Sequence, residues 1–172
     1  DPASTMFGTE QESWLFQNFA RSKGTWTVLG SATNMGYNYT PEEAMNWFGP
    51  NTPDFRKNYS RQGIAAAKAG LPYNFDNWGG YPVARSRVFA HAQKNDLNLV
   101  VVSGDSHNGW AFDLPEGGRP AGVEFGGHSV SSPGQALNGV PHRSRHRARL
   151  SWVPRTHVHI TIITTMLLRI VK

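Results

Sequence analysis

Hydrophobic positions recur with two different spacings along the chain, and segments of the two kinds alternate. Over residues 9–22 the apolar side chains recur at helical spacing, at Trp14, Leu15 and Phe19. Thr9, followed three residues later by Glu12, has the spacing of a capping box, which marks the start of a helix. We therefore predict a first helix that begins at Thr9 and ends near Ser22.

The remaining elements follow from the same spacings and from turn-forming residues. Strands are predicted over residues 25–29, 97–103, 110–114 and 123–125, with a last half-buried strand over 157–162, and helices over 40–48, 64–69 and 82–95. The rest of the segment between Gly49 and Asn77 is mostly polar and predicts a long surface excursion. A helix that leads through a tight turn into a continuous apolar strand is typical of α/β proteins.

The composition limits the classes of protein to which the chain can belong. Its 172 residues suit a single domain, and the absence of cysteine excludes disulfides and thiolate metal sites. No segment reaches the ~20 uninterrupted apolar residues of a membrane span, so we expect no transmembrane helix. The first residues lack the charged and apolar regions of a signal peptide, which leaves the localisation open.

Positive charge is concentrated near the end of the chain. Up to Glu124 there are 12 acidic residues against 10 Lys and Arg, a balance of −2, whereas from Phe125 onward 7 Lys and Arg face no acid. Residues 140–150 (VPHRSRHRARL) predict a solvated linker, an altered end of the sequence, or an arm that binds nucleic acid through phosphate contacts. We favour the first two, because aromatic interleaving is confined to Trp152. His157 and His159 are a candidate metal pair, although exposed strand histidines account for them more simply.

The apolar run over residues 97–103 ends in a polar cluster, Gly-Asp-Ser-His-Asn-Gly, at 104–109. In α/β sheets, ligands and reacting groups lie at the carboxyl ends of the strands. Asp105 and His107 lie in the turn after the strand, so both side chains can point into one crevice. A carboxylate with an imidazole suits iron, manganese, calcium or zinc.

Ser106 allows a second interpretation, in which it is a nucleophile with Asp105 and His107 as partners. A nucleophile elbow has the pattern Gly-x-Ser-x-Gly, which residues 104–109 do not match. An acid and an imidazole adjacent to the serine also cannot fold back onto its Oγ. We favour metal ligation over a serine nucleophile, and the residues alone are equally compatible with Asp105 capping a turn.

Five blocks of residues are distinctive in their order and spacing. They are 7–15 (FGTEQESWL), 26–30 (WTVLG), 76–85 (DNWGGYPVAR), 102–110 (VSGDSHNGW), and 123–125 (VEF) with 129–134 (SVSSPG). In this order they resemble the PhoD-type alkaline phosphatases, and residues 5–134 look like the C-terminal part of that family's catalytic domain. The resemblance implies a metallophosphoesterase fold, phosphomonoesterase or phosphodiesterase activity, a site that holds iron and calcium, and a periplasmic or extracellular location.

The resemblance also implies a metal site. Asp105 and His107 match the family's Gly-Asp-x-His motif, whose acid and imidazole are metal ligands, and Ser106 is then a spacer. The family's other ligands precede anything that resembles this chain, so we expect an N-terminally truncated domain. Replacement ligands would come from a partner chain or from this one, where the candidates are Glu124, Asp76, Asn34 and His128.

A second motif of the family, Trp-x-Gly-Tyr-x-x-x-Arg, is matched by Trp78, Tyr81 and Arg85. By resemblance these residues are expected to bind substrate, with Arg85 as a catalytic residue that holds a phosphate oxygen in bidentate fashion. For Arg85, a surface position on the helix that starts at Pro82 is the alternative. Gly79 stands where the family usually has Asp.

The patterns predict an α/β protein, and the resemblance implies a partial, metallophosphoesterase-like sheet layer flanked by helices over residues 1–134. A basic Arg/His-rich linker over 135–156 and a terminal strand within 157–172 are expected to follow. The predicted function is metal-dependent hydrolysis of small phosphate esters. Two alternatives remain: a catalytically silent fragment whose sheet edge pairs with a second copy in a homo-oligomer, and a nucleic-acid-binding protein that uses the Arg-rich tail.

Overall fold

The computed structural model describes residues 1–72 and 74–131 of the chain. Helices and strands follow one another in the order α1 (Thr9–Arg21), β1 (Thr27–Ser31), η1 (Glu42–Trp47), α2 (Asp54–Lys68), η2 (Trp78–Gly80), α3 (Pro82–Lys94), β2 (Leu99–Ser103), β3 (Trp110–Glu116) and β4 (Arg119–Gly126). Here η1 and η2 are short 3₁₀ helices. The α/β class predicted from the sequence is confirmed.

Four strands form one mixed sheet in the order β1-β2-β4-β3. β1, β2 and β4 are parallel neighbours, whereas β3 pairs antiparallel with β4. The turn between β3 and β4 contains Gly117 and Gly118, both at positive φ, as a tight hairpin requires. Because the three parallel strands run the same way, the loops that follow them meet at one edge of the sheet. β1 and β3 are the edge strands of the described sheet, and self-association through such an edge stays a prediction.

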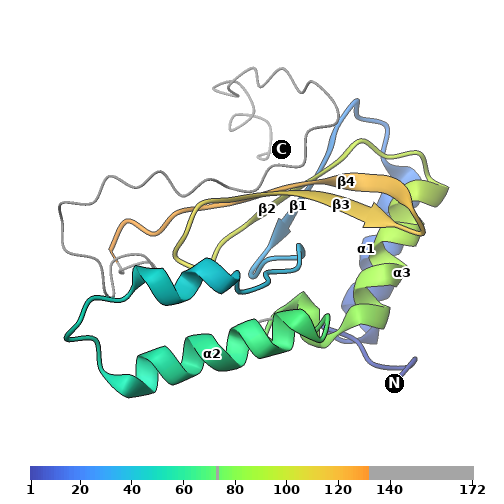
Figure 1. Ribbon diagram of the computed structural model, residues 1–172. Helices are drawn as coiled ribbons and strands as arrows, with labels where there is room; N and C mark the ends of the chain where they lie inside the picture. Colours follow the sequence, from blue (N-terminus) through green and yellow to red (C-terminus); the bar gives the residue numbers. More distant parts are fainter. Residues whose placement is uncertain (73, 132–172) are drawn as a thin grey trace.

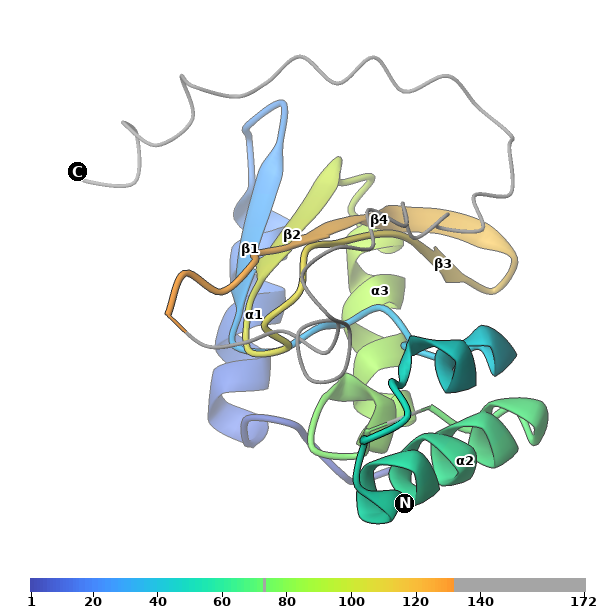
Figure 2. The ribbon, with the colours of Figure 1, turned by 60° about the vertical axis from the view of Figure 1, so that its left-hand side comes forward.

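α1 and α3 lie side by side against one face of this sheet (Figures 1 and 2). The buried apolar residues of α3 recur three and four positions apart, which places them on one side of the helix: Ala84, Val88, Phe89 and Ala92. They form one core with apolar residues of the neighbouring elements, among them Phe19, Leu99, Val101 and Leu114. Full burial of a side chain such as Val or Phe contributes about 1.5–3 kcal/mol.

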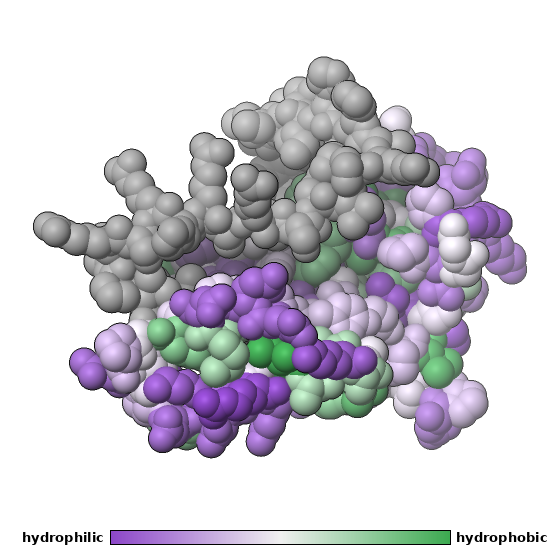
Figure 3. All heavy atoms as spheres, viewed as in Figure 1, coloured by the Kyte–Doolittle hydropathy of each residue, from purple (hydrophilic) through white to green (hydrophobic). Residues whose placement is uncertain are grey.

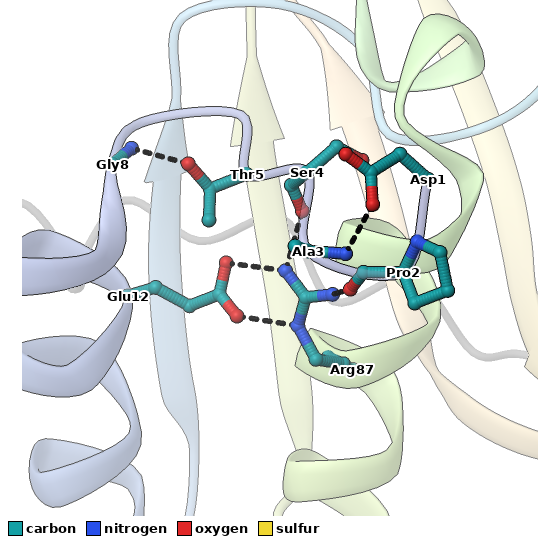
Figure 4. A network of polar contacts seen from close by, with 8 residues as sticks. All are labelled: Asp1, Pro2, Ala3, Ser4, Thr5, Gly8, Glu12 and Arg87. Atoms are coloured by element: carbon teal, nitrogen blue, oxygen red, sulfur yellow. Dashed lines mark hydrogen bonds and ion pairs between the residues drawn. The ribbon is translucent and has the colours of Figure 1, made fainter.

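An arginine fork joins α1, α3 and the first residues of the chain (Figure 4). Arg87 of α3 donates from Nε and Nη2 to the two carboxylate oxygens of Glu12, at 2.5 and 3.0 Å. It also donates to the carbonyl oxygens of Pro2 and Ser4. The predicted capping box is therefore wrong, because Glu12 pairs with Arg87 and α1 has no side-chain cap at its start.

The segment before η2 contains more helix than the sequence pattern predicts. The predicted helix over residues 64–69 is the end of the longer helix α2, which packs with η1 and not with the sheet (Figure 1). Lys68 of α2 lies 2.6 Å from Glu42 of η1. Figure 3 shows hydrophobic residues in a band along η1 and α2, bordered by hydrophilic residues. Most of α2 is polar and only its end carries an apolar run, so the sequence pattern marks helix there alone.

Several predictions fall on residues that the structure does not describe. The basic linker over 135–156, the terminal strand within 157–172 and the pair of His157 and His159 lie outside the described residues. The nucleic-acid interpretation of the Arg-rich tail lies there as well and stays a prediction. In the part of the chain that is described, no helix has the length and apolar character needed to cross a bilayer.

His91 of α3 gives the fold a pH-dependent contact. Its ring stacks on Phe16 of α1, with ring centroids 3.7 Å apart and planes 4° from parallel. Burial lowers the pKa of His91, the charge of Lys94 lowers it further, and Glu12 opposes the change. The unfolded chain therefore takes up a proton near pH 6.5 that the folded protein resists.

We expect the free energy of unfolding to decrease as the pH falls below about 6.5, and to level off below the folded pKa of His91. The loss should stay below about 1 kcal/mol, because the ring is only partly buried. Urea unfolding above and below this pH, with wild type and His91→Gln, measures the effect. The variant should lose most of the difference, and the exposed control His128→Gln should keep it. An equal pH dependence in His91→Gln would contradict the assignment.

Candidate functional site

The loops after β1 and β2 enclose a pocket at the carboxyl edge of the sheet. Its volume is about 190 Å³, and its lining is mostly amide, hydroxyl and aromatic: Thr33, Asn34, Asn38, Tyr39, Thr40, Pro41, Trp47, Asn74, Asn77, Asp105, Ser106 and Trp110. Asp105 is the only charged residue in this lining. The place predicted for the site, at the end of the strand over 97–103, is thus where the structure has a pocket.

The loop between β2 and β3 has an unusual backbone. Asp105 and His107 have φ angles of 68° and 61°, and the other non-glycine residue with positive φ among those described is Asp96. The N–H of Ser106 donates to the carbonyl of Gly104 at 2.8 Å, which closes a tight turn around Asp105. Such conformations cost about 1–3 kcal/mol each and concentrate at functional sites. Both predicted metal ligands thus have a positive φ, as does Asp96 in the turn before β2.

Ser106 anchors this loop to the start of β3. Its Oγ accepts a hydrogen bond from the indole Nε1 of Trp110 at 2.7 Å. The side chain of Asn108 donates back to the carbonyl of Ser106 at 2.9 Å. These contacts agree with a spacer role for Ser106, whose side chain fixes the loop between Asp105 and His107.

Two oxygen atoms at the pocket are buried without a hydrogen-bond partner among the described residues. They are Oγ1 of Thr33 and Oδ1 of Asn38. An unpaired buried polar atom costs about 1–3 kcal/mol. Because both atoms are shielded from solvent, the carboxylate of Asp105 is the group in the lining that can offer a charge to a cation or to a hydrogen-bond donor.

Glu124 of β4 lies directly behind the pocket and is completely buried. Its carboxylate accepts hydrogen bonds from the backbone N–H groups of Met35 and Gly36, the latter at 2.6 Å. Ser103 Oγ donates to it at 2.5 Å, and Asn34 Nδ2 lies 3.3 Å away. Glu124 and Asn34, both considered as replacement metal ligands, are therefore hydrogen-bonded to each other, and the Glu124 oxygens face protein donors.

Arg85 of α3 is buried, with 6% of its surface exposed. Its guanidinium lies 4.2 Å from the ring centroid of Tyr37 and 4.5 Å from that of Phe89. Nε donates to the carbonyl oxygen of Met35 at 2.6 Å. Burial lowers the pKa of Arg85, while Tyr37 and two carboxylates raise it. The alternative of a surface position is wrong, and Arg85 is not among the residues that line the pocket.

Trp78 and Tyr81 were predicted to bind substrate. In the structure, both side chains pack in or against the core at η2. Trp78 is 3% exposed, donates from Nε1 to Ser31 Oγ at 3.1 Å, and meets the ring of Phe7 edge to face. Tyr81 is half-buried against the same core. Neither lines the pocket, so their contact with substrate stays a prediction.

The described residues do not complete a metal site. Within residues 1–72 and 74–131, no three His, Asp or Glu side chains gather closely enough to hold a metal ion. Asp76 and His128, the other candidate ligands, are exposed, and Nδ1 of His128 lies 2.6 Å from the carbonyl of Ser129. Asp105 lines the pocket and His107 does not, so metal ligation by both residues stays a prediction.

Sequence reasoning took only Asn34 from the loop after β1, as a candidate metal ligand. It missed Thr33 and Asn38 in the pocket and the N–H groups of Met35 and Gly36 at Glu124. One signal was present in Gly36. A Cβ at this position would overlap the ring of Phe112, so the backbone can approach the sheet only with glycine there. The other residues of the loop carry no such signal, because amides and hydroxyls are common in any loop.

Comparisons with known proteins identify the family. A family model described as PhoD-like phosphatase matches residues 1–162. Alkaline phosphatase D of Bacillus subtilis (strain 168) is 30% identical over 145 residues, which cover 80% of this chain and 20% of that protein. A solved structure described as "Structure of PhoD" is similar, with 31% identity and a TM-score of 0.53, over 76% of this chain and 22% of that chain.

The chain thus spans about a fifth of the length of the curated relative that it matches. The resemblance carried by the five blocks ends at Gly134. The family match continues beyond this residue, into the predicted basic linker. The family predicted from these blocks and the partial fold predicted with it are both confirmed. This chain belongs to the PhoD-like phosphatase family.

Proposed function

We propose that this chain forms part of a metal-dependent phosphoric ester hydrolase, of alkaline phosphatase or phosphodiesterase type. In this proposal Asp105 and His107 are two ligands of the metal centre. By resemblance, the metals are iron and calcium and the substrate is a small phosphate ester. The further ligands lie outside the described residues. A periplasmic or extracellular location stays a prediction.

The observation that carries the proposal is the loop between β2 and β3. It places Asp105 and His107 at the carboxyl end of a buried parallel strand, both in a strained backbone conformation, with Asp105 in the wall of the pocket. Strain of this kind persists when the surrounding contacts hold it, as the bond from Trp110 to Ser106 does here. A carboxylate and an imidazole are suitable ligands for iron. In such hydrolases, bound metals offset the negative charge of the phosphate oxygens.

The test is hydrolysis of a chromogenic phosphate monoester and its diester by the purified chain, with and without a chelator. We expect Asp105→Asn and His107→Gln each to lower the rate by at least about 10–100-fold, since even residues behind a metal ligand have effects of this size. Bound metal, measured by elemental analysis, should decrease in both variants. The matched control is Asp113→Asn, which changes an exposed carboxylate on β3.

Activity and metal content separate the outcomes. Activity lost on chelation and in both variants, but not in the control, would support the proposal. Metal that remains bound while both variants retain full activity would refute it. A chain without activity in every form would favour the alternative of a catalytically silent fragment.

A further inference from the structure

Two buried, oppositely charged side chains hold one residue of the loop after β1. The backbone N–H of Met35 donates to both oxygens of Glu124, at 3.0 and 3.1 Å. The backbone carbonyl of the same residue accepts from Nε of Arg85 at 2.6 Å. Met35 itself is completely buried, as is Glu124, and Arg85 nearly so. We call these three residues the Met35 clamp.

In the clamp, each charged side chain bonds to the backbone group of opposite polarity. A carboxylate accepts from an N–H group and a guanidinium donates to a carbonyl, and charge-assisted hydrogen bonds are about twice as strong as neutral ones. The rings of Tyr37 and Phe89 lie against the guanidinium, so Arg85 is fixed without a direct ion pair to Glu124 among the contacts described. Arg85 is thereby bonded to the backbone of this loop, and Glu124 is bonded to the same backbone and to the side chains of Ser103 and Asn34.

The clamp is connected to both sides of the pocket. On one side, Met35 follows Asn34, which lines the pocket and whose Nδ2 donates to Ser103 Oγ at 2.8 Å. On the other side, Ser103 ends β2 and immediately precedes Gly104 and Asp105. Ser103 Oγ in turn donates to Glu124. A displacement of Glu124 therefore moves Asn34 and the start of the Asp105 loop together.

We propose that Arg85 and Glu124 are positioning residues, which hold Asn34 and the Asp105 loop in register across the pocket through the Met35 clamp. The change in activity expected from this inference rests on the proposed function, whereas the expected change in structure does not. It assigns Arg85 a task behind the pocket in place of a direct contact with phosphate. Asn34 and Asp105 come from different strand ends. The hydrogen bond from Asn34 to Ser103 joins these ends, and the clamp holds both partners of that bond through Met35 and Glu124.

The experiment compares Glu124→Gln and Arg85→Lys with wild type. Glutamine keeps the shape of Glu124 but turns one acceptor into a donor that faces the N–H groups of Met35 and Gly36. Lysine keeps the charge of Arg85 but loses the planar stack. The matched control, Glu10→Gln, changes an exposed carboxylate on α1. Thermal unfolding and near-ultraviolet circular dichroism show whether each variant is folded.

The first readout is independent of activity. In ¹H–¹⁵N spectra, the side-chain amide of Asn34, the backbone amide of Gly36 and the indole of Trp110 should all shift in both clamp variants. None should shift in the control. A role confined to local packing at Arg85 or Glu124 would lower stability and leave the Trp110 indole in place. Clamp variants that fold and leave these three signals unchanged would overturn the inference.

The second readout applies where wild type hydrolyses the chromogenic monoester. We expect kcat to fall about 10–100-fold in Glu124→Gln, because small displacements of reacting groups have effects of this size. KM and the inhibition constant of inorganic phosphate should stay within about twofold, since neither residue contacts substrate. A large increase in the phosphate inhibition constant in Arg85→Lys, with unshifted Asn34 and Gly36 signals, would show direct phosphate binding and overturn the assignment.

If Glu124→Gln does not fold, Ser103→Ala replaces it. This variant removes one hydrogen bond to Glu124 and the acceptor of Asn34 Nδ2, while the charge of Glu124 stays. The same three signals should shift in a folded protein, and unchanged signals would again overturn the inference. An inactive wild type would contradict the proposed function alone, because the spectra still test the clamp.

Discussion

Replacing Phe89 with alanine is expected to lower the free energy of unfolding by about 3–5 kcal/mol, as for other fully buried aromatic side chains. Phe89 has no exposed surface and lies between α3 and the sheet. Its ring also lies 4.5 Å from the guanidinium of Arg85. The substitution would therefore leave a cavity in the core and remove one of the two rings that hold the Met35 clamp.

Equilibrium unfolding in urea measures this loss as a decrease in the midpoint at nearly constant slope. Val83→Ala, on the same helix at a position 38% exposed, is the matched control and should change the free energy of unfolding by less than about 1 kcal/mol. A Phe89→Ala variant as stable as this control would contradict the core assigned to α3.

The second large effect is expected at Trp78. Its 3% exposure, its contact with Phe7 and its bond to Ser31 give it a core position, so Trp78→Ala should cost about 3–5 kcal/mol. If Trp78 instead contacts substrate, as the family motif implies, its replacement should raise KM while stability changes little. Urea unfolding and KM measured on the same variants distinguish the two roles.

Trp14→Ala is the control for this experiment. Trp14 lies on α1 with 61% of its surface exposed, so the same change in side-chain size there should have little effect on stability. Trp78→Phe keeps an aromatic ring but loses the hydrogen bond to Ser31, and should lie between wild type and Trp78→Ala. A stable Trp78→Ala variant with a raised KM would show that the tryptophan faces substrate.

Local patterns predicted most elements that pack on the sheet. The helix from Pro82 and the buried strand before Asp105 were expected within two residues of their observed bounds, because a proline marks the helix start and an apolar run marks the strand. The strand expected over residues 123–125 is longer, at Arg119–Gly126. α2 was underestimated, because residues 54–63 are mostly polar and only the run after them is apolar. The strand expected over residues 25–29 lies two residues later, at Thr27–Ser31, where parallel pairing with β2 fixes the register.

The residues of the candidate site also divide into those that local sequence patterns predict and those that they do not. Asp105 and His107 could be found from the sequence because they directly follow a buried strand, and strand ends in α/β sheets carry ligands. Glu12 was predicted to form part of a helix cap, but its carboxylate pairs with Arg87, which lies 75 positions later. Arg85 looked like a residue for phosphate and is packed between two aromatic rings.

The sequence by itself determined the α/β class, the family and the position of the Asp105 loop, because these depend on residues close together along the chain. Only the tertiary structure decided which side chains stand behind the pocket. Glu124 reaches Met35 across 89 positions and Arg85 reaches it across 50, and no local period records such a pairing. Burial makes these contacts necessary, since a charged group removed from water must find partners wherever the fold brings them.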